Sequence, residues 1–169
     1  GKDATGDFAI VKGGTAAKSE LGYALGSSGE ALALQKLDKP ARKKATFKVR
    51  YRSLSDDMIR NAALAFGAKP ENDSLLKAGT AIGMGNHVLF QGGWGNVTTG
   101  AMAKMKTSAG GTFELTVTVD LEKGRATASI DGRTLHLPLP KDLKHIDYYG
   151  LYAKGTQTAF SPVEVIHAE

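Results

Sequence analysis

The sequence predicts an all-β protein in which two antiparallel sheets pack face to face as a sandwich. Segments that alternate apolar and polar residues recur about every 8 to 14 residues, and glycine-rich or polar turns separate them. No segment carries a helical pattern longer than about two turns. The 21 glycines and five prolines suit many short strands joined by tight turns.

The clearest strands lie in residues 112–138. Phe113, Leu115 and Val117 begin an apolar series that alternates with polar residues up to residue 121, as in a strand with one buried face. The triplet 122–124 ends in glycine and predicts a reversal, and the Asp-Gly pair at 131–132 predicts a tight hairpin turn. This region therefore predicts three consecutive antiparallel strands.

The remaining strands follow from shorter patterns. A hairpin is expected from strands 21–25 and 31–37 around residues 27–29, and a turn at 39–44, where Pro40 cannot donate to a ladder. The other expected strands are 7–12, 46–54, 61–68, 81–84 (with Leu75 and Leu76), 88–91, 148–153 and 159–166. The alternation predicts a core that contains Phe47, Val49, Leu64, Phe66, Leu115, Val117, Val119, Ile130, Leu151, Val163 and Val165.

Composition limits the possible functions. Residues 1–169 are expected to form a single β-sandwich domain, and the start at Gly1 suggests that it is excised from a larger protein. The absence of cysteine excludes disulfides, zinc–thiolate sites and thiol nucleophiles. The net charge of +5 favours an anionic partner.

Several motifs resemble the concanavalin A-like lectin/glucanase superfamily, especially its laminin-G-like and 3-keto-disaccharide-hydrolase-like branches. They are F-x-L-x-V-x-V-D at 113–120, A-x-x-x-D-G at 128–132, and the closing segments 149–152 and 158–165. Residues 47–52 and 63–67 fit the usual strand order. The resemblance implies a two-sheet jelly-roll sandwich with one concave sheet. It also implies an accessory domain of a secreted protein that binds glycans, in some members with calcium.

An enzyme is the less favoured interpretation. Glycoside hydrolysis normally uses two carboxylates across the sugar, and the chain lacks the E-x-D-x-x-E or E-x-D-x-E cluster of the superfamily's glucanases. Asp56-Asp57 and the Asp120/Glu122 pair are interpreted as turn residues. Glu114 could act as an acid on an outward strand position, but no partner is identifiable, so no catalytic residue is assigned.

Two groups of residues are candidates for binding a glycan. Trp94 lies in a glycine-rich segment, and His87, Gln91 and Asn96 could bind sugar hydroxyls around its ring, although Trp94 could instead close one end of the core. Lys48, Arg50 and Arg52 would stand about 6.8 Å apart on one strand face. We call these three residues the basic stripe; it could track an acidic or sulfated polysaccharide, or simply be a solvated strand face.

No cofactor is assigned beyond calcium, for which Asp3, Asp7 and Glu164 could meet where the terminal strands pair. Nucleic acid and membrane insertion are not expected, since neither a binding motif nor a long apolar run is present. The leading hypothesis is a non-catalytic carbohydrate-binding or accessory domain of a secreted carbohydrate-active or sulfatase-type protein, extracellular or periplasmic. The alternatives are a glycoside hydrolase of the same fold and a structural domain that packs on a catalytic neighbour.

Overall fold

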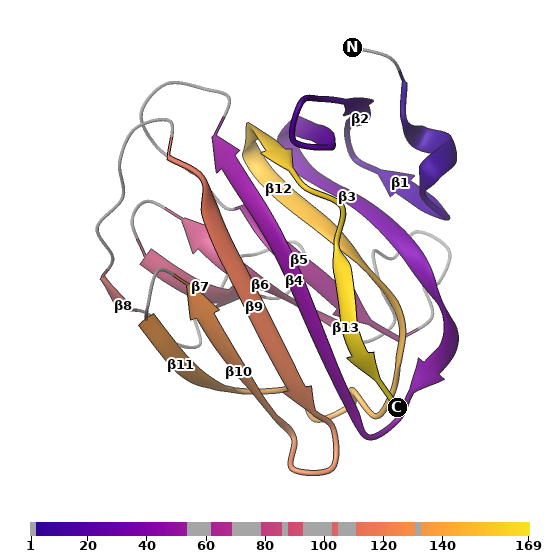
Figure 1. Ribbon diagram of the computed structural model, residues 1–169, viewed down its shortest axis with the longest axis vertical. Helices are drawn as coiled ribbons and strands as arrows, with labels where there is room; N and C mark the ends of the chain where they lie inside the picture. The colour runs from indigo at the N-terminus through magenta and orange to yellow at the C-terminus, as the bar shows by residue number, and fades with distance from the viewer. Residues whose placement is uncertain are drawn as a thin grey trace.

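Strands make up most of the computed structural model, which describes residues 3–53, 62–68, 79–85, 88–92, 103–104, 111–130 and 133–169 (Figure 1). In chain order the elements are the 3-10 turn η1 (Thr5–Asp7) and the strands β1 (Ile10–Lys12), β2 (Thr15–Lys18), β3 (Tyr23–Ala41), β4 (Lys44–Ser53), β5 (Ala62–Gly67), β6 (Gly79–Gly85), β7 (Val88–Gly92), β8 (Ala103–Lys104), β9 (Phe113–Asp120), β10 (Arg125–Ile130), β11 (Arg133–Pro138), β12 (Ile146–Phe160) and β13 (Glu164–Ala168). Among these described residues, no helix is long and apolar enough to cross a membrane.

The first layer of the sandwich has the strand order β11-β10-β9-β4, and β13 pairs with the other side of β4. All these pairs are antiparallel. The three consecutive strands predicted for residues 112–138 are confirmed as β9, β10 and β11. Val117 lies opposite Ala128, so the apolar positions of neighbouring strands share one face.

The second layer has the order β3-β12-β5-β6-β7-β8, and β1 and β2 pair with the outer side of β3. Strand β12 belongs to both layers. Its residues 148–153 pair with β5, whereas Thr158, Ala159 and Phe160 pair with β4. Hydrogen bonds therefore continue from one layer into the other, and the end of β12 fixes their relative position.

Apolar side chains from alternate positions of both layers fill the space between them. All the predicted core residues are buried except Val165, which is half-buried and packs against the others. Tyr51 lies between Phe113 and Phe160, with ring centroids 6.1 and 5.9 Å away. Burial of each such ring stabilises the fold by roughly 1.5–3 kcal/mol.

The predicted hairpin around residues 27–29 is wrong, because β3 runs without a turn from Tyr23 to Ala41. Its partner β12 has 15 residues against the 19 of β3, and the register between them shifts twice, between Ile146 and Tyr148 and between Lys154 and Thr156. Glu30 lies opposite Lys154 and Ser27 opposite Thr156, so two residues of β3 face Gly155 alone. The polar and glycine residues that suggested a turn form a β-bulge instead.

The predicted break between strands 148–153 and 159–166 is also wrong, because β12 continues through Gly155 to Phe160. The break comes later, where Pro162 lacks the N–H that a ladder needs. There Ser161 replaces the ladder, because the Arg50 N–H donates to Ser161 Oγ and the Ser161 N–H donates to the Arg50 carbonyl, both at 2.8 Å. The expected strand 7–12 is also shorter, beginning at Ile10 after η1.

Candidate functional site

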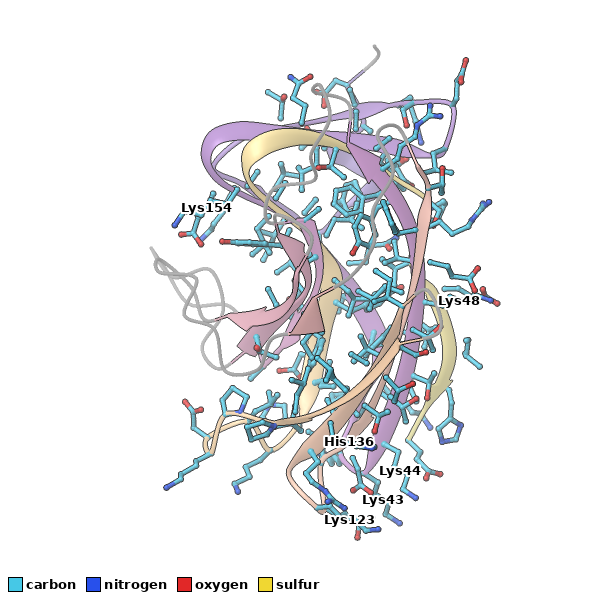
Figure 2. All side chains as sticks on the ribbon, turned by 90° about the vertical axis from the view of Figure 1, so that its left-hand side faces the viewer. Lys43, Lys44, Lys48, Lys123, His136 and Lys154 are labelled. Atoms are coloured by element: carbon cyan, nitrogen blue, oxygen red, sulfur yellow. The ribbon has the colours of Figure 1, made fainter. Side chains whose placement is uncertain are left out.

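The basic stripe lies on the outer face of the first layer. Strand β4 turns Phe47, Val49 and Tyr51 into the core, so Lys48 and its neighbours on alternate positions face outward. Figure 2 shows Lys48 on one side of the sandwich and Lys154, of β12, on the opposite side.

Carboxylates accompany the stripe. Lys48 Nζ lies 3.3 Å from Glu114 Oε1, and an Arg52 guanidinium nitrogen lies 3.7 Å from Glu20 Oε2. The register also places Glu164 of β13 opposite Lys48, and Glu114 of β9 opposite Arg50. This face of β4 is therefore a mixed-charge surface, and a role of the stripe in binding stays a prediction.

Most of the predicted Trp94 site lies outside the described residues. Trp94, His87 and Asn96 are not among them, whereas Gln91 lies in β7 opposite Ile82 of β6. Their role in binding a ligand stays a prediction.

The carboxylates proposed for calcium do not meet. Asp3 accepts a hydrogen bond from the Thr5 N–H at 2.9 Å, Asp7 pairs with Lys18, and Glu164 lies on β13 opposite Lys48. Within the described part of the chain, no three His, Asp or Glu side chains form a group that could hold a metal ion.

A second apolar cluster covers the outer face of the second layer, which is curved with Lys154 on its hollow side (Figure 2). Its members are buried: Leu32, Leu34, Ala63, Ala65, Ala81 and Tyr152. The Tyr152 hydroxyl donates to Glu30 Oε2 at 2.6 Å. Burial raises the pKa of Tyr152 strongly, and the hydrogen bond to the Glu30 carboxylate raises it further, so the hydroxyl keeps its proton.

Sequence reasoning missed this second cluster, although a signal exists. Residues 31–34 and 62–66 are apolar at every position, which is typical of strands buried on both faces.

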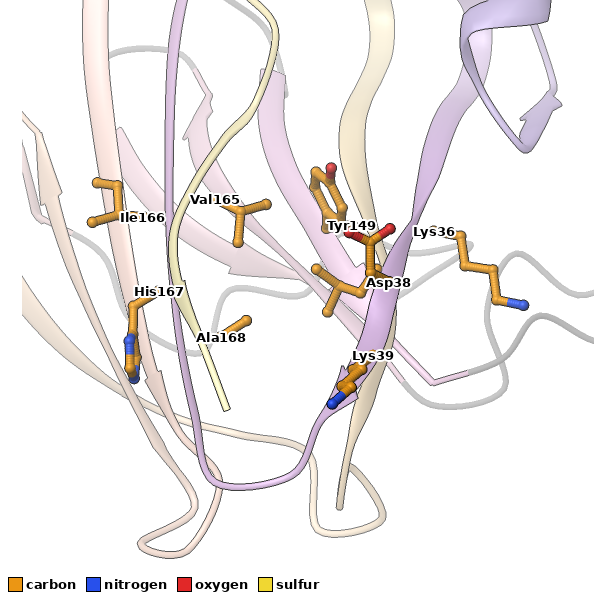
Figure 3. Close-up of a pocket in the computed structure, with 9 residues that line it drawn as sticks. Lys36, Asp38, Lys39, Tyr149, Val165, Ile166, His167 and Ala168 are labelled. Atoms are coloured by element: carbon orange, nitrogen blue, oxygen red, sulfur yellow. The ribbon is translucent and has the colours of Figure 1, made fainter.

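An open groove of about 540 Å³ lies at the side of the sandwich, between β3 and β13 (Figure 3). We call it the side groove; its lining is Lys36, Leu37, Asp38, Lys39, Tyr149, Val165, Ile166, His167 and Ala168. In Figure 3, Tyr149 and Asp38 lie next to each other on the β3 side, and Val165 and Ala168 point toward them from β13. Its volume falls within the range of small-molecule pockets, about 300–1,000 Å³.

Tyr149 is the central side chain of the groove. Its ring is half-buried and stacks on Phe47, with centroids 5.4 Å apart and planes 18° apart. Burial raises the pKa of the Tyr149 hydroxyl, and the negative charge of Asp38 raises it further. The hydroxyl is therefore a hydrogen-bond donor at neutral pH beside an exposed carboxylate acceptor.

The rim of the groove is polar. Lys36 and Lys39 are exposed on β3, and His167 Nε2 lies 3.5 Å from Glu169 Oε1. An aromatic ring beside a carboxylate can contact both the apolar face and the hydroxyls of a sugar.

Comparison with solved structures identifies proteins of the same architecture. The carbohydrate-binding module CBM66 from Bacillus subtilis has a TM-score of 0.67 and 15% sequence identity, over 91% of this chain and 92% of that chain. A sialidase has a TM-score of 0.62 and 10% identity, over 91% of this chain but 16% of its own. A family 7 alginate lyase in complex with its substrate has a TM-score of 0.54 and 15% identity, over 90% of this chain and 81% of that chain.

The fold is the concanavalin-like jelly roll. This confirms the fold class predicted from the sequence, while the laminin-G-like and hydrolase-like branches stay predictions. Neither a protein-family model nor a curated protein sequence matches the chain.

Proposed function

We propose that this domain recognises carbohydrate without cleaving it. The observation that carries the proposal is the jelly-roll sandwich shared with a carbohydrate-binding module over more than nine-tenths of both chains. Because one fold hosts many functions, the residues of the site must also suit a sugar.

The side groove supports the proposal. Tyr149 offers an aromatic surface and a hydroxyl donor, and Asp38 offers acceptors for sugar hydroxyls. Lys39 on the rim adds a donor. This combination suits a neutral or weakly charged sugar ring better than a metal ion or a large apolar ligand.

Calorimetry and affinity electrophoresis against a panel of glycans test the proposal. The panel contains neutral glucans, lactose and alginate. We expect saturable binding to at least one glycan, and Asp38→Asn should weaken it about tenfold, because it removes a charged acceptor. Asp142→Asn, which makes the same change on an exposed turn, is the matched control.

A panel in which no glycan binds would overturn the proposal. Equal effects of Asp38→Asn and Asp142→Asn would reject the groove as the site while leaving glycan recognition in place. The Ala168→Arg variant gives an independent check, because it places a long side chain at the wall of the groove without altering the core. It should weaken glycan binding if the groove is the site.

The proposal keeps the contacts expected around Trp94. A Trp94→Ala variant that loses affinity for the same glycan would assign that segment to the site, and unchanged affinity would remove it. The wider role also remains part of the proposal: an accessory domain in a secreted or periplasmic carbohydrate-active parent protein, sulfatase-type proteins included.

Glycan cleavage is the second candidate, because the solved structures of this architecture include alginate lyases. Glu114, the residue considered as an acid, is 52% exposed and ion-paired with Lys48, and Arg50 is its register neighbour on β4. Hydrolysis would need a second carboxylate across the sugar from Glu114, whereas these two neighbours of Glu114 are cations. Release of new sugar ends from any panel glycan, abolished in Glu114→Gln, would favour the enzyme.

A further inference from the structure

Exposed cations gather at one end of the sandwich, on the turns that join β3 to β4 and β9 to β10. Figure 2 shows Lys43, Lys44 and Lys123 together at this end of the molecule. We call the group the basic end; it consists of Arg42, Lys43, Lys44, Lys123 and Arg125, all of them exposed.

Backbone hydrogen bonds hold the two turns side by side. The Leu121 N–H donates to the Lys43 carbonyl at 2.8 Å. The main-chain oxygen of Glu169 accepts from the N–H groups of Arg42, Lys43 and Lys44, and Asp120 Oδ1 accepts from the Lys123 N–H at 2.9 Å. The cations therefore project from a fixed backbone, which lowers the entropy cost of arranging them around a ligand.

The charges of the basic end differ from those of the basic stripe. No salt bridge in the described part of the chain involves any of the five cations, whereas Lys48 and Arg52 of the stripe are both paired with glutamates. The carboxylates nearest in sequence and register are Asp120, Glu122 and Glu169. Asp120 already accepts a backbone hydrogen bond, and Glu169 lies near His167.

Register gives the cations a spacing. Lys44, Asp120 and Arg125 lie opposite one another on three adjacent strands. Because neighbouring strands are about 4.8 Å apart, the Lys44 and Arg125 backbones are roughly 10 Å apart on one face. Separated cations on a fixed edge suit an extended anionic chain better than a single small anion.

We propose that the basic end binds the anionic groups, uronate or sulfate, of an acidic polysaccharide. This inference rests on the proposed function and places the anionic part of the ligand at this end rather than on the stripe. A nucleic acid fits less well, because residues 42–44 and 120–125 hold no aromatic side chain on which a base could stack.

Charge reversal in the full chain tests the proposal. One triple variant carries Lys43→Glu, Lys44→Glu and Lys123→Glu. The matched control carries Lys48→Glu, Arg50→Glu and Arg52→Glu, which changes the net charge equally. Calorimetry with alginate, dextran sulfate, neutral dextran and duplex DNA, at low and physiological salt, measures affinity, and circular dichroism confirms that each variant is folded.

We expect the basic-end variant to bind alginate or dextran sulfate at least about tenfold more weakly than the control, and its affinity to depend less on salt. Binding of alginate but not dextran sulfate would identify carboxylate recognition, and binding of dextran sulfate but not alginate would identify sulfate recognition. Equal losses in both variants would show a net-charge effect and overturn the proposal, as would duplex DNA binding as tightly as either polysaccharide.

The two proposals fail in different ways. If neutral glycans bind through the side groove while the basic-end variant keeps its affinity for acidic polymers, this inference alone is wrong. If no glycan of either kind binds, both proposals are wrong.

Discussion

At the scale of single residues, Gly150 of β12 lies so close to the β3 backbone that no side chain fits there. A Cβ atom there would lie 1.9 Å from the Ala33 carbonyl oxygen and 2.9 Å from the Leu34 Cα. Both obstacles are backbone atoms, so a side chain could fit only if the two strands moved apart.

Gly150→Ala should therefore lower the free energy of unfolding by about 1–3 kcal/mol, the usual cost of overpacking a well-packed site. Gly29→Ala is the control, because a Cβ at Gly29 meets no atom within 4 Å. We expect the control to change stability by less than about 0.5 kcal/mol. Denaturant titration measures both, and equal losses would contradict the close approach.

Tyr152 makes the stability of the protein depend on alkaline pH. In the unfolded chain its hydroxyl ionises near the ordinary pKa of 10.0, whereas burial and Glu30 raise the pKa in the folded state. The stabilising contribution is therefore complete below pH 10 and is lost as the pH rises above that value, because only the unfolded chain releases the proton.

Tyr152→Phe should lower the free energy of unfolding at pH 7 by about 1.5–3 kcal/mol, since it removes a hydrogen bond to a carboxylate. It should also flatten the fall in stability above pH 10. Thermal melts between pH 7 and 11 measure both effects. If the melting temperature of the variant falls as steeply above pH 10 as that of the unchanged protein, Tyr152 does not cause the alkaline loss of stability.

At the scale of elements, strands with one wet face were predictable and strands buried on both faces were harder to delimit. Residues 113–120 alternate so regularly that register and burial follow from the sequence, and β4 behaves in the same way. In β3, Ser27, Ser28 and Gly29 have the composition of a turn, and only pairing with the distant β12 makes them a bulge. Tertiary pairing overrode the local preference.

The site was predictable to a smaller extent. The outward position of the basic stripe follows from alternation along β4, but its partners Glu20, Glu114 and Glu164 come from other elements and have no local signal. The side groove joins residues 36–39, 149 and 165–168. Sequence spacing cannot bring such distant segments together without the strand order.

The β-bulge opposite Gly155 can be tested by substitution. Gly155 has φ of +67°, a left-handed conformation that costs an L residue about 1–2 kcal/mol, and a Cβ there would meet nothing within 4 Å. Gly155→Ala should therefore destabilise the protein by about 1 kcal/mol, and Gly155→Asn by less, because asparagine tolerates this region. Chemical unfolding of the two variants measures their stability. An alanine variant as stable as the original protein would contradict the left-handed conformation of Gly155.

At the scale of the whole molecule, β12 connects the two layers and pairs with strands from the beginning of the chain. The hydrogen bond from Tyr152 to Glu30 alone spans 122 residues. Such non-local pairing requires large loops to close before contacts form, so folding should be slow for a chain of this size.

Refolding from denaturant should take milliseconds to seconds, the range of sandwiches dominated by distant strand pairs. Stopped-flow circular dichroism measures it. Complete refolding within tens of microseconds would contradict the observed topology.

The side groove has a further consequence for how the molecule behaves in crowded solution. Within residues 35–41 of β3, Gln35, Lys36 and Ala41 pair with β12, and no strand of the described chain pairs with the other side. An unpaired strand edge of this kind can pair with a second copy of the chain and start aggregation. Lys36, Lys39 and Pro40 occupy this edge. Repulsion between the ammonium groups and the missing N–H of the proline would prevent strand pairing between neighbouring copies. The lysines at the groove would therefore also keep the protein soluble.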